Sequence, residues 1–301
     1  MKLLLKRIGQ ILLFIVLLIL IINIFPTPEV VSVNPFMEEE RLYVASQSGC
    51  GDNYPRNTMY AFEKAAAMGV QTFAIKIFAT QDDVLVISDS DNLSDFSDGN
   101  GYITKSNYKD IKGLNFAYQF QDDKGSYPYR LNDLACITID KLFERFQYSN
   151  FIIEIMETEN NSKHTAYLLC EEIRKAKLSN RVVVIGDRDA VEVVRNDVNS
   201  TIFTAPSKKE RYKFNLYRHL LLENLYFNLP FQYSQMNYNI ESKRSTKRYI
   251  KACNRRNISV FLSSVNSEEA LKIAKDVKCN GIITENPKKI LELIGTDKSN
   301  E

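Results

Sequence analysis

The sequence contains few side chains suited to acid–base chemistry. Histidine, the usual proton-transfer group near neutral pH, occurs only at His164 and His219. His164 lies at the start of a predicted helix rich in surface residues, and His219 ends the basic segment 208–219. We therefore expect both imidazoles to be solvated surface groups, although any mechanism that needs two histidines has only these two available.

Carboxylates and thiols give weak signals for a metal site. Asp89, Asp91, Asp95 and Asp98 form an acidic cluster, but its spacing does not match an EF-hand loop, so a solvated acidic loop is predicted. The five cysteines include no C-x-x-C pair that would indicate zinc or redox chemistry, and we expect buried thiols. They occupy these positions: Cys50, Cys136, Cys170, Cys253 and Cys279.

Composition limits the class of protein. The 301 residues are 45% hydrophobic and 25% charged, which is enough for a substantial buried core. Lys and Arg total 39 against 37 for Asp and Glu, giving a formal charge of +2. This balance gives no electrostatic case for a nucleic-acid partner.

The N-terminal segment is predicted to be a membrane anchor. Residues 8–25 are almost entirely Ile, Leu, Val and Phe, and as a helix would extend about 27 Å, just enough to cross a bilayer. Basic residues in the segment 1–7 place the N-terminus in the cytoplasm and the remaining chain outside the plasma membrane. No small-x-small cleavage site follows, so an uncleaved single-pass signal anchor is favoured over a cleaved signal peptide. Residues 26–40, rich in proline and glutamate, read as an extracytoplasmic stalk rather than part of a core.

The remaining chain alternates short β-rich runs with amphipathic stretches, a pattern typical of an α/β domain with a parallel sheet. It is interpreted as one domain over 41–295, with an insertion at 89–134 and a tail at 296–301. Strands are predicted at 42–45, 72–78, 84–88, 151–156, 182–186, 201–204, 225–228, 259–262 and 281–284. Helices are predicted at 58–68, 139–146, 163–176, 190–195, 245–256 and 267–277, the first capped by Asn57. The strand candidates number one more than an eightfold barrel requires.

Several motifs in order resemble the glycerophosphodiester phosphodiesterase family. The stretch from Tyr54-Pro55-Arg56-Asn57-Thr58 to Gly69 is similar to that family's Pro-Glu-Asn-Thr motif and the glycine-ended helix after it. Residues 84–89 (VLVISD) resemble its Val-Val-x-His-Asp strand, 153–155 (IEI) its Ile-Glu-Ile-Lys strand, and 281–287 (GIITENP) its Gly-Ile-Ile-Thr-Asp-x-Pro ending. The resemblance implies a TIM-type (β/α)8 barrel with its site at the carboxyl ends of the strands. It also implies hydrolysis of phosphodiesters by two histidines and a divalent cation such as Mg²⁺ or Ca²⁺.

The proton-transfer positions implied by the family are altered. Its first histidine and the following arginine align with Ser46 and Gln47, and its second histidine aligns with Ser88. A serine hydroxyl does not titrate near pH 7. No Gly-x-Ser-x-Gly elbow or neighbouring histidine marks either serine as a nucleophile.

The cation-binding positions implied by the family are altered as well. The glutamate before Asn-Thr is Arg56, and the family's Glu-x-Asp pair aligns with Ala74 and Lys76. Glu154 is retained, whereas the lysine two residues later is Met156. One carboxylate makes a poor Mg²⁺ or Ca²⁺ site, so no cofactor is predicted; instead Lys76 is expected to pair with Glu154.

These replacements favour a catalytically inactive family member whose pocket binds a phosphate-containing headgroup or an envelope polymer. The candidate ligand-binding residues are Ser46, Gln47, Arg56, Lys76, Ser88, Asp89 and Glu154. A pocket that binds nothing is a comparable alternative. A second alternative is an active phosphoric diester hydrolase of lipid metabolism with relocated catalytic residues drawn from the acidic cluster.

A third alternative is a membrane-tethered interaction module. Region 208–247 is rich in tyrosine and basic residues and is expected to form a partner-binding face, although half of its tyrosines would fit equally well in a core. The residues concerned are Tyr212, Tyr217, Tyr226, Tyr233, Tyr238, Lys208, Lys209, Lys213 and Arg218.

Overall fold

The computed structural model describes residues 2–24, 34, 36–37, 42–156, 161–197, 201–226, 229–239 and 242–298. The strands are β1 (Tyr43–Gln47), β2 (Thr72–Ala79), β3 (Leu85–Ile87), β4 (Asn150–Ile155), β5 (Val182–Ile185), β6 (Phe203–Thr204), β7 (Tyr233–Asn237), β8 (Ser259–Ser263) and β9 (Gly281–Thr284). The α-helices are α1 (Lys2–Ile24), α2 (Met59–Ala67), α3 (Tyr108–Ile111), α4 (Ile139–Arg145), α5 (Ser162–Ala176), α6 (Arg188–Asn196), α7 (Lys208–His219), α8 (Lys243–Asn254), α9 (Glu268–Val277) and α10 (Pro287–Lys298). Short 3-10 helices are η1 (Leu93–Asp95), η2 (Ile103–Lys105), η3 (Ser179–Arg181) and η4 (Glu223–Leu225).

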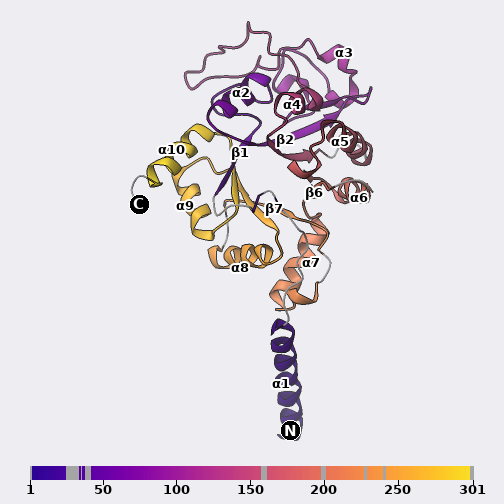
Figure 1. Ribbon diagram of the computed structural model, residues 1–301, viewed down its shortest axis with the longest axis vertical. Coiled ribbons are helices and arrows are strands. Elements are labelled where there is room, and N and C mark those ends of the chain that lie inside the picture. Colours follow the sequence, from indigo (N-terminus) through magenta and orange to yellow (C-terminus); the bar gives the residue numbers. More distant parts are fainter. Residues whose placement is uncertain are drawn as a thin grey trace.

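The predicted barrel is confirmed as a nearly closed parallel sheet surrounded by helices (Figure 1). Eight strands pair in the order β6-β5-β4-β2-β1-β9-β8-β7, and the ninth, β3, pairs antiparallel with β2. This explains the surplus strand candidate, because β3 lies outside the barrel path. At the seam, Gln232 N donates to Thr204 O at 3.1 Å and Gln232 Oε1 accepts from Thr204 N at 3.1 Å.

The barrel interior is filled by apolar side chains that point inward from the strands. Tyr43, Tyr233 and Phe261 surround the ring of Phe36, which is 1% exposed, and the Phe36 and Phe261 ring centroids are 5.3 Å apart. Because Tyr43 and Tyr233 are the first residues of their strands, Phe36 closes the amino-terminal end of the barrel. Gly281 is required here, since a Cβ atom would lie 2.3 Å from the Phe261 ring.

Three local predictions need correction. The strand predicted at 225–228 is wrong, since Leu225 ends η4 and residues 227–228 lie outside the described residues. The strand in this part of the barrel is β7, which was not predicted because its polar sequence contains no apolar run. The helix cap predicted at Asn57 is wrong, because Thr58 accepts the hydrogen bond from Ala61 N. The stalk prediction fails at Asn34 and Phe36, which are buried, while most of 26–40 lies outside the described residues.

The segment predicted as an insertion folds over one end of the barrel. It contains η1, η2 and α3, and its own apolar cluster includes Leu93, Ile103 and Phe116, packed on Phe78 of β2. All five cysteines are buried and none forms a disulfide, as predicted.

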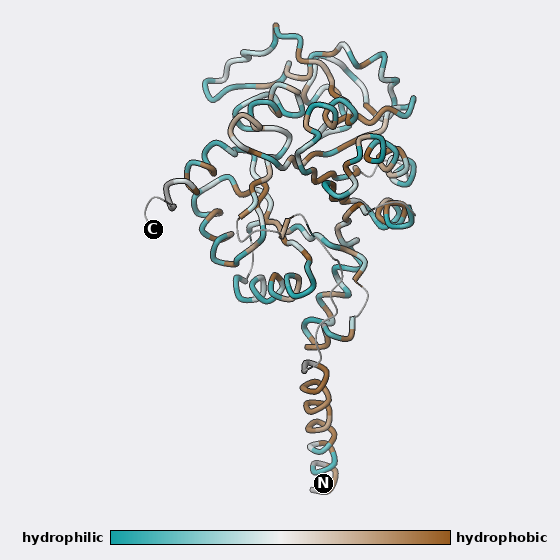
Figure 2. The backbone as a smooth tube through the Cα atoms, in the orientation of Figure 1, coloured by the Kyte–Doolittle hydropathy of each residue, from teal (hydrophilic) through white to brown (hydrophobic). Residues whose placement is uncertain are grey.

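The N-terminal segment forms α1, a helix that projects away from the barrel (Figure 1) and is mostly hydrophobic along its length (Figure 2). Phe25, the last residue of the predicted anchor, lies outside the described residues. Across the described parts of the chain, no helix combines the length and the hydropathy needed to cross a membrane.

Candidate binding site at the carboxyl ends of the strands

The turn that follows β1 places the first polar groups of the site. Ser48 has a left-handed backbone, with φ of 54°, and its hydroxyl donates to the Asp89 carboxylate at 2.8 and 2.9 Å. Gly49 follows with φ of 93°, and a Cβ atom there would lie 2.7 Å from Ala61 Cβ of α2. The loop after β1 is thus packed on α2 and bonded to the loop after β3.

Arg56 lies at the centre of three carboxylates. Its Nη1 atom is 2.9 Å from Glu285 Oε1 and 3.6 Å from Asp89 Oδ2, and its Nη2 atom is 3.9 Å from Asp52 Oδ1. Partial burial disfavours the charged guanidinium, but the hydrogen bond and negative charge of Glu285 raise the pKa of Arg56 overall. Burial and the charge of Glu285 raise the pKa of Asp52, while Arg56 opposes that shift.

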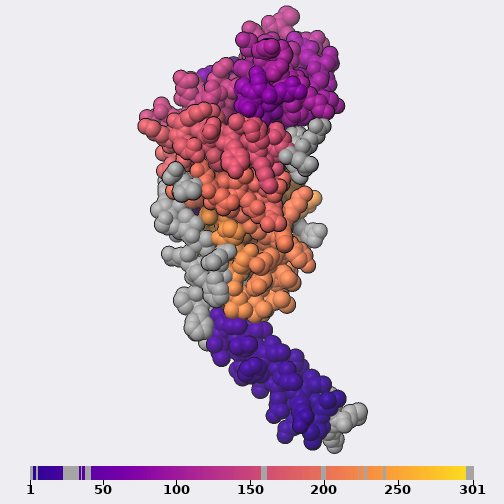
Figure 3. All heavy atoms as spheres, turned by 90° about the vertical axis from the view of Figure 1, so that its right-hand side faces the viewer, coloured from indigo at the N-terminus to yellow at the C-terminus, as the bar shows by residue number. Residues whose placement is uncertain are grey.

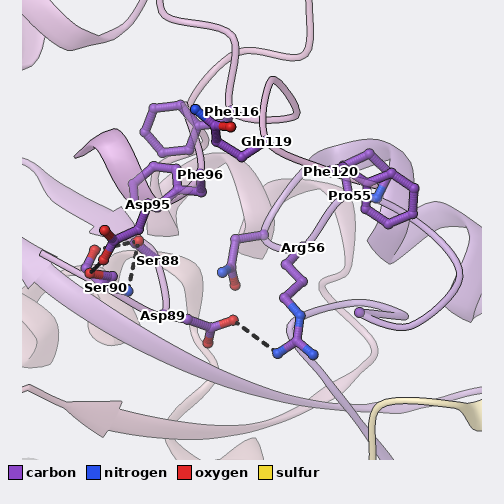
Figure 4. Close-up of a pocket in the computed structure, with 12 residues that line it drawn as sticks. Pro55, Arg56, Ser88, Asp89, Ser90, Asp95, Phe96, Phe116, Gln119 and Phe120 are labelled. Atoms are coloured by element: carbon purple, nitrogen blue, oxygen red, sulfur yellow. Dashed lines mark hydrogen bonds and ion pairs between the residues drawn. The ribbon is translucent and has the colours of Figure 1, made fainter. Parts of the chain in front are cut away.

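A pocket of about 280 Å³ opens beside Arg56 (Figure 4). One side presents Arg56, Ser88 and Asp89 from the loops at the strand ends. The other side is built by the insertion, and its residues include Asp95, Phe96, Phe116, Gln119 and Phe120. The rings of Phe96 and Phe116 have centroids 4.7 Å apart, so the pocket combines an apolar wall with hydrogen-bonding groups.

The structure brings together only three of the seven predicted site residues in this pocket: Arg56, Ser88 and Asp89. Ser46 lies buried on β1, and its Oγ has no hydrogen-bond partner among the described residues. Gln47 Nε2 approaches Ser48 Oγ at 3.5 Å without lining the pocket.

Lys76 and Glu154 are direct neighbours in the register of β2 and β4. The predicted ion pair between them does not form, since no Nζ–carboxylate distance of 4.0 Å or less joins them. Glu154 instead influences Tyr233 on β7. Burial is the main cause that raises the pKa of Tyr233 well above its ordinary value, and the negative charge of Glu154 raises it further. The cation that compensates carboxylates at the barrel mouth is Arg56, not Lys76.

The hydroxyl of Ser88 is used in a turn. It donates to Ser90 O at 2.6 Å and accepts from Ser90 N at 3.2 Å. This local bonding holds the loop after β3, and it supports the prediction that Ser88 is not a nucleophile.

Both histidines lie outside the pocket, on the surface, as predicted. His164 Nε2 is 2.6 Å from Asp83 Oδ1, and His219 Nδ1 donates to Asn215 O at 2.7 Å. Neither imidazole is placed to exchange a proton with a group held beside Arg56.

Asp91 and Asp98 of the insertion accept hydrogen bonds from other residues of the same insertion. Asp91 accepts from Thr104 N at 2.9 Å and from its hydroxyl at 2.7 Å, and Asp98 accepts from Asn115 N at 2.8 Å. In the described part of the chain no group of three or more His, Cys, Asp or Glu side chains is arranged to hold a metal ion. With a guanidinium bound between Asp89 and Glu285, these residues do not fit the divalent cation that the family resemblance implies.

Glu285 and most of the residues that line the pocket were not among the predicted site residues. Glu285 stands in the quoted closing motif, and its position directly after a strand was a usable signal. The aromatic wall of Phe96, Phe116 and Phe120 had no such signal, because only the folding of the insertion brings these residues to the strand ends.

Comparisons with known proteins agree with this architecture. A model described as the glycerophosphoryl diester phosphodiesterase family matches residues 48–289. A glycerophosphoryl diester phosphodiesterase domain from Mycobacterium tuberculosis superposes with a TM-score of 0.69 at 12% identity, covering 83% of this chain and 98% of that one. An Oleispira antarctica phosphodiesterase, solved with the product sn-glycerol-3-phosphate, gives 0.66 at 17% identity, covering 84% and 96%. A glycerophosphodiester phosphodiesterase from Thermotoga maritima gives 0.61 at 15% identity, covering 85% and 100%. No curated protein sequence matches the chain.

Proposed function

The chain belongs to the glycerophosphoryl diester phosphodiesterase family, and from this membership we propose that it is a catalytically inactive member that binds a polar ligand at its barrel mouth. One observation carries the proposal: the Arg56 guanidinium lies 2.9 Å from Glu285 and 3.6 Å from Asp89. It neutralises carboxylates that would otherwise be available to a metal ion. The barrel mouth is therefore stabilised by a cation of the chain itself.

Hydrolysis of a phosphodiester requires a group that activates the nucleophile and a group that protonates the leaving alkoxide. Among the described residues that line the pocket, the titratable ones are Arg56, Asp89 and Asp95. Asp89 already accepts two hydrogen-bond contacts from Ser48, and Asp95 accepts from Asn92 Nδ2 at 3.1 Å. This arrangement suits binding better than proton transfer.

The ligand that fits the pocket is a polyhydroxylated group, such as the glycerol or sugar part of an envelope polymer. Phenylalanine faces provide apolar contact for the carbon skeleton, while Asp89, Asp95 and Gln119 provide acceptors and donors for hydroxyls. A bare phosphate fits less well, because Arg56 already pairs with Glu285 and the lining carries two further carboxylates. We therefore expect Arg56 to contact the neutral, polyhydroxylated part of the ligand rather than a phosphate group.

The proposal includes attachment of the chain to the plasma membrane through the N-terminal segment 8–25, with the N-terminus in the cytoplasm and the barrel outside, although the described part of α1 does not on its own reach the length and hydropathy of a spanning helix. It is supported by the exposed apolar side chains along α1, among them Leu12, Phe14 and Leu17, and by the basic residues Lys6 and Arg7 before them. Recovery of the full chain in the membrane fraction after carbonate washing, with the barrel open to added protease in spheroplasts, tests this attachment. A chain that stays soluble after cell lysis would contradict it.

The catalytic part is tested with the full chain in a non-ionic detergent. Glycerophosphoglycerol is incubated with the protein in Mg²⁺, in Ca²⁺ and with a chelator, and we expect no release of glycerol 3-phosphate above the buffer blank. Release that is lost in Asp89→Asn but kept in the surface variant Asp140→Asn would show an active enzyme.

The binding part is tested by calorimetry with glycerophosphoglycerol on the same preparation. Phe116→Ala and Phe120→Ala should each weaken binding, whereas Tyr148→Ala, which removes an exposed ring outside the pocket, should not. Equal effects of all three variants, or no binding at all, would contradict the proposed binding function and favour a pocket that binds nothing.

A further inference from the structure

Helices α7 and α8 lie on the side of the barrel away from the insertion (Figure 1). A second pocket, of about 520 Å³, is lined by residues of both helices. It is distinct from the Arg56 pocket and shares no lining residue with it. Helix α7 contributes Arg211, Asn215, Arg218 and His219, and the other side is formed by the end of β7 and the first turns of α8. None of the described lining residues is acidic.

The two arginines have N–H donors without a hydrogen-bond partner among the described residues. Arg218 donates to Ser245 O and Ser245 Oγ, both at a long 3.4 Å. The Nε atoms of Arg211 and Arg218 are buried and have no hydrogen-bond partner among the described residues. A buried guanidinium N–H without an acceptor is costly, so an anionic acceptor in this pocket would stabilise both side chains.

Two carboxylates that neighbour these helices, Glu210 of α7 and Asp276 of α9, are occupied elsewhere. Glu210, the residue before Arg211, pairs with Arg195 at 2.7 Å and caps α7 through Ser207. Asp276 pairs with Lys243 at 3.0 Å, on the outer face of α8. The first turn of α8 contains no acidic residue, so its amino-terminal dipole adds to the positive potential of the arginines.

The remaining polar groups match an oxyanion with several acceptor oxygens. His219 uses its Nδ1–H on Asn215 O at 2.7 Å, so its neutral imidazole adds no further N–H donor to the lining. Asn215 and Asn237 add amide donors to the lining. We propose that this pocket binds a phosphate group, held by the forked guanidinium groups of Arg211 and Arg218.

The position of the pocket suggests two sources for that phosphate. Helix α7 and η4 lie next to the end of α1, where Asn224 Nδ2 donates to Ile22 O at 3.3 Å (Figure 3). Leu216, Leu220 and Leu225 are exposed on this same part of the molecule. The phosphate is therefore either the headgroup of an anionic lipid or part of a small soluble ligand.

Titration of the full chain in a non-ionic detergent with inorganic phosphate, at ionic strength held constant with chloride, tests the site. We expect a saturable rise in melting temperature, and an apparent Kd that increases at least about tenfold in Arg211→Gln/Arg218→Gln. The control Lys208→Gln/Lys209→Gln removes two exposed charges of the same helix outside the pocket and should leave the Kd unchanged.

Because loss of two partly buried arginines can disturb packing, Asn237→Asp serves as a second variant. It keeps the oxygen that accepts from Asn239 N at 2.9 Å, but adds a negative charge to the pocket, and should also weaken phosphate binding at least about tenfold. No saturable phosphate effect, or equal weakening in the lysine control, would overturn the proposal.

A parallel titration with dioctanoylphosphatidylglycerol and dioctanoylphosphatidylcholine separates the two sources. If the anionic lipid binds at least about tenfold more tightly than inorganic phosphate, and loses this advantage in Asn237→Asp, the occupant is a lipid headgroup. If the anionic lipid binds no more tightly than inorganic phosphate, the occupant is a soluble phosphate compound. Failure of this site leaves the polyol pocket beside Arg56 untouched, because the two share no residue.

Discussion

Arg56 introduces a permanent positive charge at a position where the related family motif has a carboxylate. Asp52, Asp89 and Glu285 surround it, and the Arg56 side chain is 40% exposed, so solvent weakens each ion pair. The cluster nevertheless acts as a unit, because removal of the guanidinium would leave three carboxylates facing one another. The effect of that removal should depend on pH.

Arg56→Gln should lower the free energy of unfolding by about 1 kcal/mol near neutral pH. Arg56 opposes the rise that burial and Glu285 cause in the pKa of Asp52, so without the cation the pKa of Asp52 in the folded state should rise further. The folded variant then binds protons more readily than the unfolded chain, so its defect should shrink as the pH falls from about 7 to about 5. Urea unfolding at both pH values measures this.

Two controls accompany that experiment. Arg56→Lys keeps the charge and should keep most of the stability, and Arg145→Gln removes an exposed pair with Glu63 and should show little pH dependence. A defect in Arg56→Gln that stays constant or grows on acidification would contradict the carboxylate cluster.

Two buried serines should respond to truncation with opposite signs. Ser46 is fully buried and its Oγ has no partner among the described residues, so Ser46→Ala should raise the free energy of unfolding by about 1 kcal/mol. The hydroxyl of Ser88 bonds to Ser90, so Ser88→Ala should lower it by about 1 kcal/mol. Chemical denaturation of both variants under one condition is the measurement, and destabilisation by Ser46→Ala would mean that its hydroxyl has a partner after all.

At the scale of elements, the sequence predicts those strands whose apolar residues form a clear pattern along the chain. The buried strands β2, β4 and β9 are rich in apolar residues, with single charged residues at Lys76 in β2 and Glu154 in β4, and the structure confirms them within one or two residues. Strand β7 escapes detection because Ser234 and Gln235 interrupt its apolar pattern, and pairing with β8 decides its conformation. The same limit applies to the site: Asp89 follows a predictable strand, whereas Phe116 reaches the pocket only through tertiary folding of the insertion.

The cap of α2 offers a direct test at this scale. Thr58 Oγ1 accepts from Ala61 N at 3.3 Å and donates to Pro55 O at 2.7 Å, so Thr58→Ala should cost about 1 kcal/mol of unfolding free energy. Thr58→Ser should keep both bonds and most of the stability. Asn57→Gly should be nearly neutral, because Asn57 has φ of 59°, which glycine adopts readily. A larger loss of stability in Asn57→Gly than in Thr58→Ala, measured by thermal unfolding, would indicate that Asn57 rather than Thr58 caps α2.

At the scale of the whole molecule, the barrel has a seam between β6 and β7. Gln232 bridges it in both directions, through its own N–H and through the side-chain oxygen that accepts from Thr204 N. The same residue accepts at its backbone oxygen from Asn34 Nδ2 at 2.9 Å, which links the seam to the segment carrying Phe36. Strand β6 has only two residues, Phe203 and Thr204, so few ladder bonds hold this edge.

The seam should therefore open before the rest of the barrel. In hydrogen exchange of the native protein, we expect amides of β6 and β7 to exchange faster than those of β2 and β4, which pair along six positions. Gln232→Leu removes the side-chain acceptor while keeping the backbone bonds, and should speed exchange at β6 by about tenfold, leaving β2 and β4 unchanged. Since apolar packing of Phe36 against Tyr233 remains in that variant, the free energy of global unfolding should fall by less than the free energy of local opening at β6. Uniform acceleration in all strands would instead mean that the barrel opens as one cooperative unit, with the seam as stable as its centre.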